Sequence, residues 1–189
     1  MTADILKRKI EIRKKLLELD ASCLFRQFLP YVNPSYSRQW YHALIADKCQ
    51  ALIEGKIRNL MIFVPPQHGK SEILSRNFPA WAFGYDPDLK IVGCSYSSDL
   101  ANQFSRSIQR IMDSPEYLHI FPETRLNSSN LRTVTRGYLR NVDMFEIVNH
   151  KGFYKAQGVC GSLTGTAVDI AIIDDPVKDA IEAYSPTYR

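Results

Sequence analysis

The sequence predicts one α/β domain with a mostly parallel sheet flanked by helices. Two apolar segments, 60–64 and 90–95, have the composition of strands, and each leads into a segment of helical character. A third apolar run, 168–174, lacks clean alternation, which is typical of a parallel strand buried on both faces. The length of 189 residues, with 45% hydrophobic and 23% charged residues, fits a single globular domain.

Two helices are expected before the first strand. Residues 3–20 are charged, with apolar residues near helical spacing, and they predict a peripheral helix. Prolines and polar residues at 30–35 indicate a loop. Residues 39–54 then predict a second helix, which Gly55 ends.

The helix that follows the strand 60–64 is expected to run from Ser71 until Pro79 disturbs it. Asp86-Pro87 indicates a turn before the strand 90–95. Residues 98–113 place their apolar side chains on one stripe of a helix that Ser97 or Ser98 can cap.

A β-hairpin is expected in the second half of the chain. Segments 143–148 and 153–159 flank a turn at residues 149–152. Three glycines, Gly158, Gly161 and Gly165, then lead into the last strand.

The segment around Gly69-Lys70-Ser71 predicts a phosphate-binding loop. It follows an apolar strand and opens a helix, so backbone N–H groups, the positive end of the helix dipole and the Lys70 ammonium would converge on a polyphosphate. The Ser71 hydroxyl can ligate Mg²⁺. The amides of Gln67 to Ser71 are the expected donors, and His68 is expected to shape the loop or contact a phosphate. The sequence therefore predicts a nucleotide site.

The loop departs from the usual phosphate-loop pattern at its first position. That pattern begins with a glycine where this sequence has Val64, and Pro65 and Pro66 have no amide hydrogen. We expect the later residues to form the cradle. A surface turn with a chance Gly-Lys-Ser is the alternative, which the flanking strand and helix disfavour.

Two adjacent carboxylates end the last apolar run. Ligands bind beyond the carboxyl ends of parallel strands, so Asp174 is placed to hold Mg²⁺ through its water shell, and Asp175 to orient or deprotonate an attacking water. Pro176 biases Asp175 toward an extended conformation. A plain turn after a core strand is the alternative.

Composition adds weaker constraints. The formal net charge of +4 allows a polyanionic partner without requiring one. The four cysteines lack metal-ligand spacing, so reduced thiols are expected and zinc is not. His42 and His119 are expected to be structural. The sequence shows no signal peptide and no apolar run of membrane length, so we expect a cytoplasmic protein with no membrane partner.

Several blocks of residues, taken in order, resemble the ATPase region of tailed-phage terminase large subunits. These blocks are 65–72, 78–81, 95–101, 104–106, 163–165 and 172–179. The resemblance covers residues 28–189 and leaves 1–27 as an N-terminal helical extension. It implies a P-loop NTPase of the additional-strand catalytic-glutamate class, with the two motifs as Walker A and Walker B.

The resemblance also implies a function and partners. Such proteins are ATP-driven motors, with Mg²⁺, that package double-stranded DNA into procapsids in the bacterial host cytoplasm. They act as a ring of identical subunits on the portal protein, together with a small terminase subunit. A phage or a prophage origin is implied.

Carried over residue by residue, the resemblance implies that Lys70 and Ser71 bind the phosphates and Mg²⁺. It implies that Asp174 is the carboxylate that binds Mg²⁺. Asp175 stands where many relatives have a catalytic glutamate, although aspartate is one methylene shorter. Some relatives have an arginine inside the loop, at the position of Pro66 here, so the stabilising charge must come from elsewhere.

Arg106 faces away from the core on its helix and is the candidate for a finger supplied to a neighbouring subunit. A solvated helix arginine is the alternative. Gln39 and Trp40 stand where such motors hold an adenine-contacting glutamine and aromatic residue. A core role for Trp40 is the alternative.

The family's chains continue past the second motif with a coupling motif and a nuclease domain, neither of which we find in this sequence. In the additional-strand fold, the next strand inserts between the Walker A and Walker B strands. We therefore expect an incomplete sheet and a truncated motor domain. Besides an ATP-hydrolysing motor, a remnant with a binding or structural role remains open, as does another P-loop nucleic-acid translocase, although no second helicase motif set is present.

Overall fold

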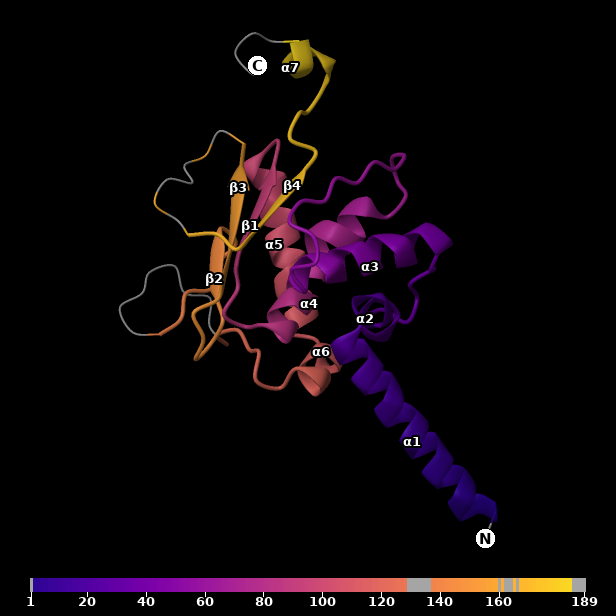
Figure 1. Ribbon diagram of the computed structural model, residues 1–189. Coiled ribbons are helices and arrows are strands. Elements are labelled where there is room, and N and C mark those ends of the chain that lie inside the picture. The colour runs from indigo at the N-terminus through magenta and orange to yellow at the C-terminus, as the bar shows by residue number, and fades with distance from the viewer. Residues whose placement is uncertain (1, 129–136, 160, 162–164, 166, 185–189) are drawn as a thin grey trace.

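The computed structural model describes residues 2–128, 137–159, 161, 165 and 167–184, and its architecture is mixed α/β (Figure 1). In chain order, the elements are α1 (Thr2–Cys23), α2 (Phe25–Val32), α3 (Trp40–Ile53), a π-helical segment η1 (Glu72–Asn77), α4 (Phe78–Tyr85), β1 (Lys90–Ser95), α5 (Ser98–Met112), α6 (Pro115–Ile120), β2 (Met144–Glu146), β3 (Phe153–Gly158), β4 (Ile170–Asp174) and α7 (Ala180–Tyr184). The expected helices at 3–20, 39–54 and 98–113, the strand 90–95 and the hairpin are confirmed.

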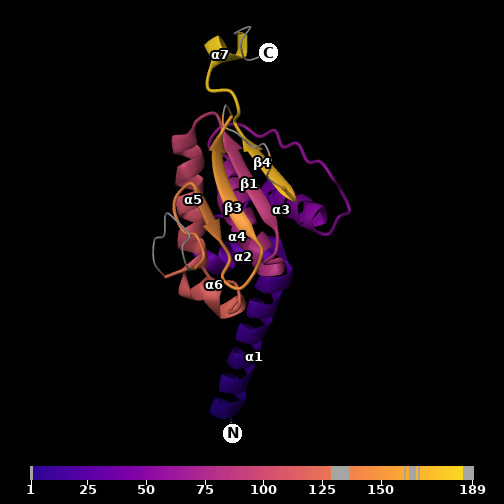
Figure 2. The same cartoon turned by 90° about the vertical axis from the view of Figure 1, so that its left-hand side faces the viewer.

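The four strands form one mostly parallel sheet in the order β2-β3-β1-β4. β1 pairs in parallel with both β3 and β4, whereas β2 pairs antiparallel with β3. Helices α2, α3, α4 and α5 lie on one side of the strands in Figure 1, and Figure 2 shows the molecule from the sheet side. Because β1 and β4 pair in parallel, their carboxyl ends lie side by side, with Ser95 opposite Asp174.

β4, which ends at Asp174 directly before Asp175, is an edge strand in the described sheet, so the expectation of burial on both faces is wrong. Ile170 is buried toward the helices, but Ile173 is 65% exposed on the other face. The physical reason is that the described helices cover one face only, and β4 has β1 as its one described neighbour.

The core is an aromatic cluster between the helices and the sheet. Phe25 and Phe28 of α2 are fully buried, and the ring of Phe25 lies 5.3 Å from that of Trp81 in α4. Helix α2 includes Pro30 and extends into residues 30–32, where a loop was expected. It also runs across residue 28, the expected start of the domain. Burying several aromatic side chains together accounts for much of the drive to fold.

The segment 60–64 is not a strand in the structure, so this prediction is wrong. Its side chains do alternate, with Leu60, Ile62 and Val64 packed against the core, while Phe63 is 89% exposed. A cavity of about 490 Å³ lies between residues 60–63 and the residues of β4. Because no described strand lies within hydrogen-bonding distance on that side, the segment has an alternating pattern without a ladder.

Pro79 does not end the helix that follows the loop, contrary to expectation. Helical geometry runs from Lys70 to Tyr85, with the π-helical segment η1 inside it. The backbone returns to α-helical geometry at Phe78, which places Pro79 in the first turn of α4. The π-helical segment shifts the hydrogen-bond register just before Pro79, with the Phe78 N–H bonded to the Ile73 carbonyl, and the helix continues through a residue without an amide hydrogen.

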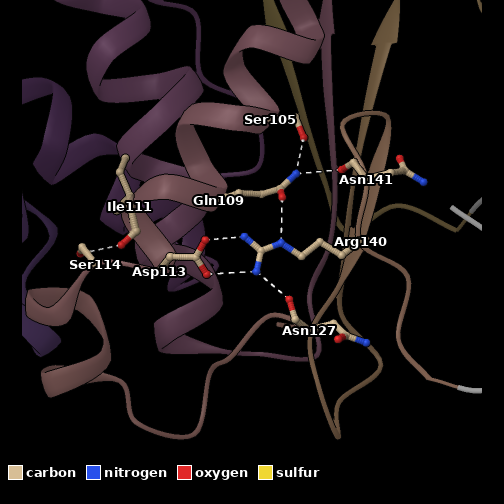
Figure 3. A network of polar contacts seen from close by, with 8 residues as sticks. All are labelled: Ser105, Gln109, Ile111, Asp113, Ser114, Asn127, Arg140 and Asn141. Carbon is tan, nitrogen blue, oxygen red and sulfur yellow. Dashed lines mark hydrogen bonds and ion pairs between the residues drawn. The ribbon is translucent and has the colours of Figure 1, made fainter. Parts of the chain in front are cut away.

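A hydrogen-bonded cluster around Arg140 fastens the chain before β2 to the end of α5 (Figure 3). The Arg140 guanidinium forms a two-pronged ion pair with Asp113, and its Nε donates to Gln109 Oε1 at 3.1 Å. Gln109 in turn donates to the backbone oxygen of Asn141 at 2.8 Å. The cluster lies near β2, at the opposite edge of the sheet from β4.

Helix α1 projects away from the body of the molecule (Figure 1). Its side chains are mostly exposed until Ala21, which is buried. Among the described helices, none combines the length and the apolar character needed to cross a bilayer. Of the residues that carried the resemblance, Leu163 and Thr164 lie outside the described part of the chain.

Candidate nucleotide site

The loop at residues 65–71 is shaped by two left-handed residues. Gln67 has φ 62° and Gly69 has φ 78°, and helical geometry begins at Lys70. A side chain at position 69 would bring its Cβ to 3.0 Å from His42 Nε2, so this position needs glycine both for its φ and for its space. The loop therefore delivers its last amides to the start of a helix, where an anion is favoured.

His42 holds this loop from the side of α3. The backbone N–H of Gln39 donates to His42 Nδ1 at 3.2 Å, so Nε2 carries the hydrogen and donates to the His68 carbonyl at 3.1 Å. The His68 ring in turn donates from Nδ1 to the Pro66 carbonyl at 2.7 Å. His42 and His68 thus act on the loop backbone, as a structural and a loop-shaping histidine.

The structure brings the loop lysine and the two carboxylates together. Lys70 Nζ lies 3.1 Å from Asp174 Oδ1 and also forms an ion pair with Asp175 Oδ1. The Asp174 side chain is 5% exposed and the Asp175 side chain 62% exposed. The two motifs, more than a hundred residues apart in sequence, therefore form one cluster at the carboxyl end of β4.

Asp174 is held as a buried anion. Its Oδ2 accepts a hydrogen bond from Ser75 Oγ at 2.6 Å, and Ser71 also donates to this carboxylate. Burial alone raises the pKa of Asp174, but the hydrogen bonds from Ser71, Ser75 and Lys70 outweigh it, so the pKa lies below its usual value. Burial disfavours the charged form of Lys70 too and by itself would lower the pKa of this lysine. Its bonds to Asp175 and Asp174 outweigh burial, so the pKa of Lys70 is raised.

The backbone of Asp175 differs from the expected extended conformation. Its φ is 46°, in the left-handed region, and its carbonyl accepts a hydrogen bond from the Tyr96 amide at 3.2 Å. A following proline disfavours the right-handed helical region, and aspartate tolerates the left-handed one, so the ion pair with Lys70 can select it. The carboxylate of Asp175 consequently faces the loop.

Gln39 and Trp40 are the two residues expected to contact the adenine base, and only Trp40 lines a cavity beside the loop. Trp40 is 79% exposed and lines an apolar cavity of about 510 Å³ together with His68 and the segment 60–65. A core role for Trp40 is therefore ruled out. Gln39 is not among the described residues that line this cavity, and its amide begins the hydrogen-bonded chain through His42.

Arg106 is exposed on α5, on the side away from the buried stripe, as its helical position predicts. In the described part of the chain, no hydrogen-bond or ion-pair partner contacts it, and it lies outside the lining of the loop cavity. The structure does not bring Arg106 to the loop of its own chain.

Three residues of the site were missed by the sequence analysis: Glu72, Ser75 and Arg76. Ser75 lies four positions after Ser71, so both face the same carboxylate, and this helical spacing could have been read from the sequence. Glu72 and Arg76 line the cavity at the loop, which has a volume of about 340 Å³. Their placement depends on the π-helical segment, for which the sequence offered no signal.

The fold and site define an α/β protein in which a loop-borne lysine meets a pair of carboxylates at the ends of parallel strands. The family model for the terminase large subunit, T4likevirus-type, N-terminal, matches residues 61–189, more than half of the chain. The chain belongs to this family of terminase large subunits. No curated protein matches the sequence.

Proposed function

We propose that this chain is the ATP-binding and ATP-hydrolysing part of a motor that packages double-stranded DNA, and that its fold is of the additional-strand P-loop class. The observation that carries the proposal is the contact of Lys70 with Asp174 and Asp175. This contact lies beside a loop in which two residues have a left-handed backbone conformation. Membership of the terminase large subunit family supports the same function.

Lys70 is the residue on which nucleotide binding would depend. Its ammonium is held between two carboxylates at the mouth of the loop, close to the amides of residues 67–71. An incoming triphosphate offers the ammonium a stronger set of oxygen acceptors, and the loop amides add donors that cost no reorganisation. We therefore assign phosphate contacts to Gln67, His68, Gly69, Lys70 and Ser71.

The residues that would hold Mg²⁺ are Ser71 and Asp174. One hydroxyl and one carboxylate are few ligands, and no cluster of three or more metal-binding side chains occurs within the described residues. That count suits Mg²⁺, which keeps several waters and shares its remaining positions with phosphate oxygens. Bound there, Mg²⁺ would neutralise charge on the phosphates. Asp174 is kept ionised for this task by its hydrogen bonds.

Asp175 is the proposed general base, the residue that orients or deprotonates the attacking water. Its side chain is largely exposed, faces the loop cavity and is one residue beyond the proposed Mg²⁺ carboxylate. A carboxylate with access to water and proximity to the terminal phosphate meets the geometric requirement for this role. Its contact with Lys70 must break before it can act.

The proposed partners follow from the family. They are double-stranded DNA, the portal protein and the small terminase subunit, with identical subunits arranged in a ring. In such a ring, the exposed position of Arg106 on α5 suits a finger that reaches the phosphates of the neighbouring chain. The adenine base of the nucleotide would lie near Trp40, with Gln39 next to it in sequence.

Calorimetric titration with ATP in the presence of Mg²⁺ tests the proposed binding. We expect saturable binding that falls at least tenfold in Lys70→Ala, because the ammonium contacts are charge-assisted. Lys9→Ala, on the exposed helix α1, is the matched control and should bind as the wild type does. Equal affinity in Lys70→Ala and the wild type would refute the site.

Phosphate release, measured with and without double-stranded DNA, tests turnover. An active motor should release phosphate above the level of an Asp175→Ala variant that still binds ATP. ATP binding without release above that variant would instead favour the remnant with a binding role.

A further inference from the structure

A second cation borders the loop cavity besides Lys70. Arg76, in the π-helical segment η1, lines the cavity of about 340 Å³ together with Lys70, Ser71 and Asp175. Helical side chains lean toward the N-terminus of their helix, and the N-terminus of this helix is the loop. The arginine therefore leans toward the proposed phosphate position.

The guanidinium of Arg76 is held but not fully satisfied. Its Nη1 donates to Glu72 Oε2 at 2.7 Å, and its central carbon lies 5.9 Å from the ring centre of Phe104. Its Nε is buried and has no hydrogen-bond partner among the described residues. An arginine has five N–H donors, so the Nη donors that Glu72 does not take remain for a further acceptor.

Glu72 is itself fixed as the counter-ion. Its Oε1 accepts from Asn77 Nδ2 at 3.1 Å, while its Oε2 takes the arginine. Each cation at the cavity thus has its own carboxylate: Lys70 has Asp174 and Asp175, and Arg76 has Glu72. A bound polyphosphate would attract both cations and repel Glu72.

We propose that Arg76 contacts the terminal phosphate of the nucleotide bound by its own chain, with Glu72 as the competing acceptor that restrains it. This inference rests on the proposed nucleotide site. It places a second cation of the same chain, beside Lys70, at the cavity of the loop. A planar guanidinium suits a phosphoryl group whose negative charge spreads over three oxygens, which a single ammonium matches less well.

The inference predicts discrimination between nucleotides. Because the proposed contact is to the last phosphate, its loss should weaken the binding of ATP and spare that of ADP. Arg76→Gln should weaken ATP binding by roughly ten- to a hundredfold and ADP binding by no more than about threefold. Glu72→Gln should act in the opposite direction and tighten ATP binding, because the restraint and the repulsion are both removed.

The test is calorimetric titration of the full chain with Mg²⁺-ATP and Mg²⁺-ADP. Arg110→Gln, on the exposed side of α5, is the matched control and should change neither affinity. Arg76→Lys keeps the charge and should retain part of the preference for ATP. Thermal melting of each variant shows that it is folded. If Arg76→Gln does not fold, Arg76→Lys and Glu72→Gln still test the proposal.

The outcomes separate this inference from the site on which it rests. Weakened ATP binding in Arg76→Gln with near-normal ADP binding, or tighter ATP binding in Glu72→Gln, supports the contact. Unchanged ATP affinity in the arginine and glutamate variants, or equal losses for ATP and ADP, overturns it, while loss of binding in Lys70→Ala alone keeps the nucleotide site. No binding of ATP by the wild type overturns both.

Discussion

Replacing Ser75 with alanine tests the geometry of the buried carboxylate directly. Ser75 Oγ donates to Asp174 Oδ2 at 2.6 Å, and both residues are buried. The substitution leaves Ser71 and Lys70 as donors and removes the one that comes from the next turn of the helix. The buried anion then has one donor fewer, and no water replaces that donor without cost.

The expected loss of stability follows from the type of bond. A hydrogen bond to a charged group contributes about 1.5–3 kcal/mol, and alanine regains a few tenths through its higher helix propensity. We therefore expect Ser75→Ala to lower the free energy of unfolding by about 2 kcal/mol near pH 7. In a domain of this size, that loss corresponds to a fall in Tm of roughly 4–8 °C.

The pH dependence gives the same prediction a sign. The pKa of Asp174 is lowered in the folded protein, so its contribution to stability is present above the ordinary aspartate pKa of about 3.9 and is lost as the pH falls through the folded value. The difference between wild type and Ser75→Ala should be largest near neutral pH. It should shrink below about pH 4, because the carboxylate becomes protonated in both proteins.

Urea unfolding at pH 7, 5 and 3, followed by circular dichroism, measures this difference. Ser107→Ala is the control, since Ser107 Oγ donates to the Gln103 carbonyl on the exposed side of α5 and should change stability by less than about 0.5 kcal/mol. Equal urea midpoints for Ser75→Ala and wild type at pH 7 would refute the bond. A difference that grows toward acid would refute the ionised state of Asp174.

Two further substitutions separate the site from the rest of the fold. Gly69→Ala should destabilise the protein by about 1–2 kcal/mol, because position 69 has a left-handed φ and its Cβ would meet His42, and calorimetry should show weaker ATP binding in the same variant. Arg140→Ala should cost about 2 kcal/mol in urea unfolding through the loss of its bonds to Asp113 and Gln109, yet leave ATP affinity unchanged; a change in affinity would contradict the separation of that cluster from the loop.

The elements with a strong local signal could be predicted from the sequence. Helix α5 combines a single apolar stripe with a serine cap, and Leu100 N does bond Ser97 Oγ at 3.2 Å. The strand β1 and the hairpin likewise have boundaries within a few residues of those expected. In each case, the periodicity and the turn residues point to the same element, so tertiary contacts had nothing to override.

The errors lie where long-range contacts decide the structure. Residues 60–64 alternate as a strand does, but a strand also needs a partner, and alternation cannot reveal whether one is present. The apolar run of β4 indicated burial on both faces, whereas burial depends on what covers the second face. Asp175, with its left-handed backbone, pairs with a lysine more than a hundred residues away, a contact that local propensity does not show.

The site keeps its geometry although residues 60–64 form no strand, and the reason lies in how the loop is fastened. Behind the loop, His42 binds the His68 carbonyl from α3. Ahead of it, Ser75 fastens the helix to Asp174, and Lys70 spans the remaining gap. The attachments run to two elements, α3 through His42 and β4 through Asp174, so the loop does not depend on a ladder at residues 60–64. Removing His42 or Ser75 should therefore disturb the loop more than a change at the exposed side chains of that segment.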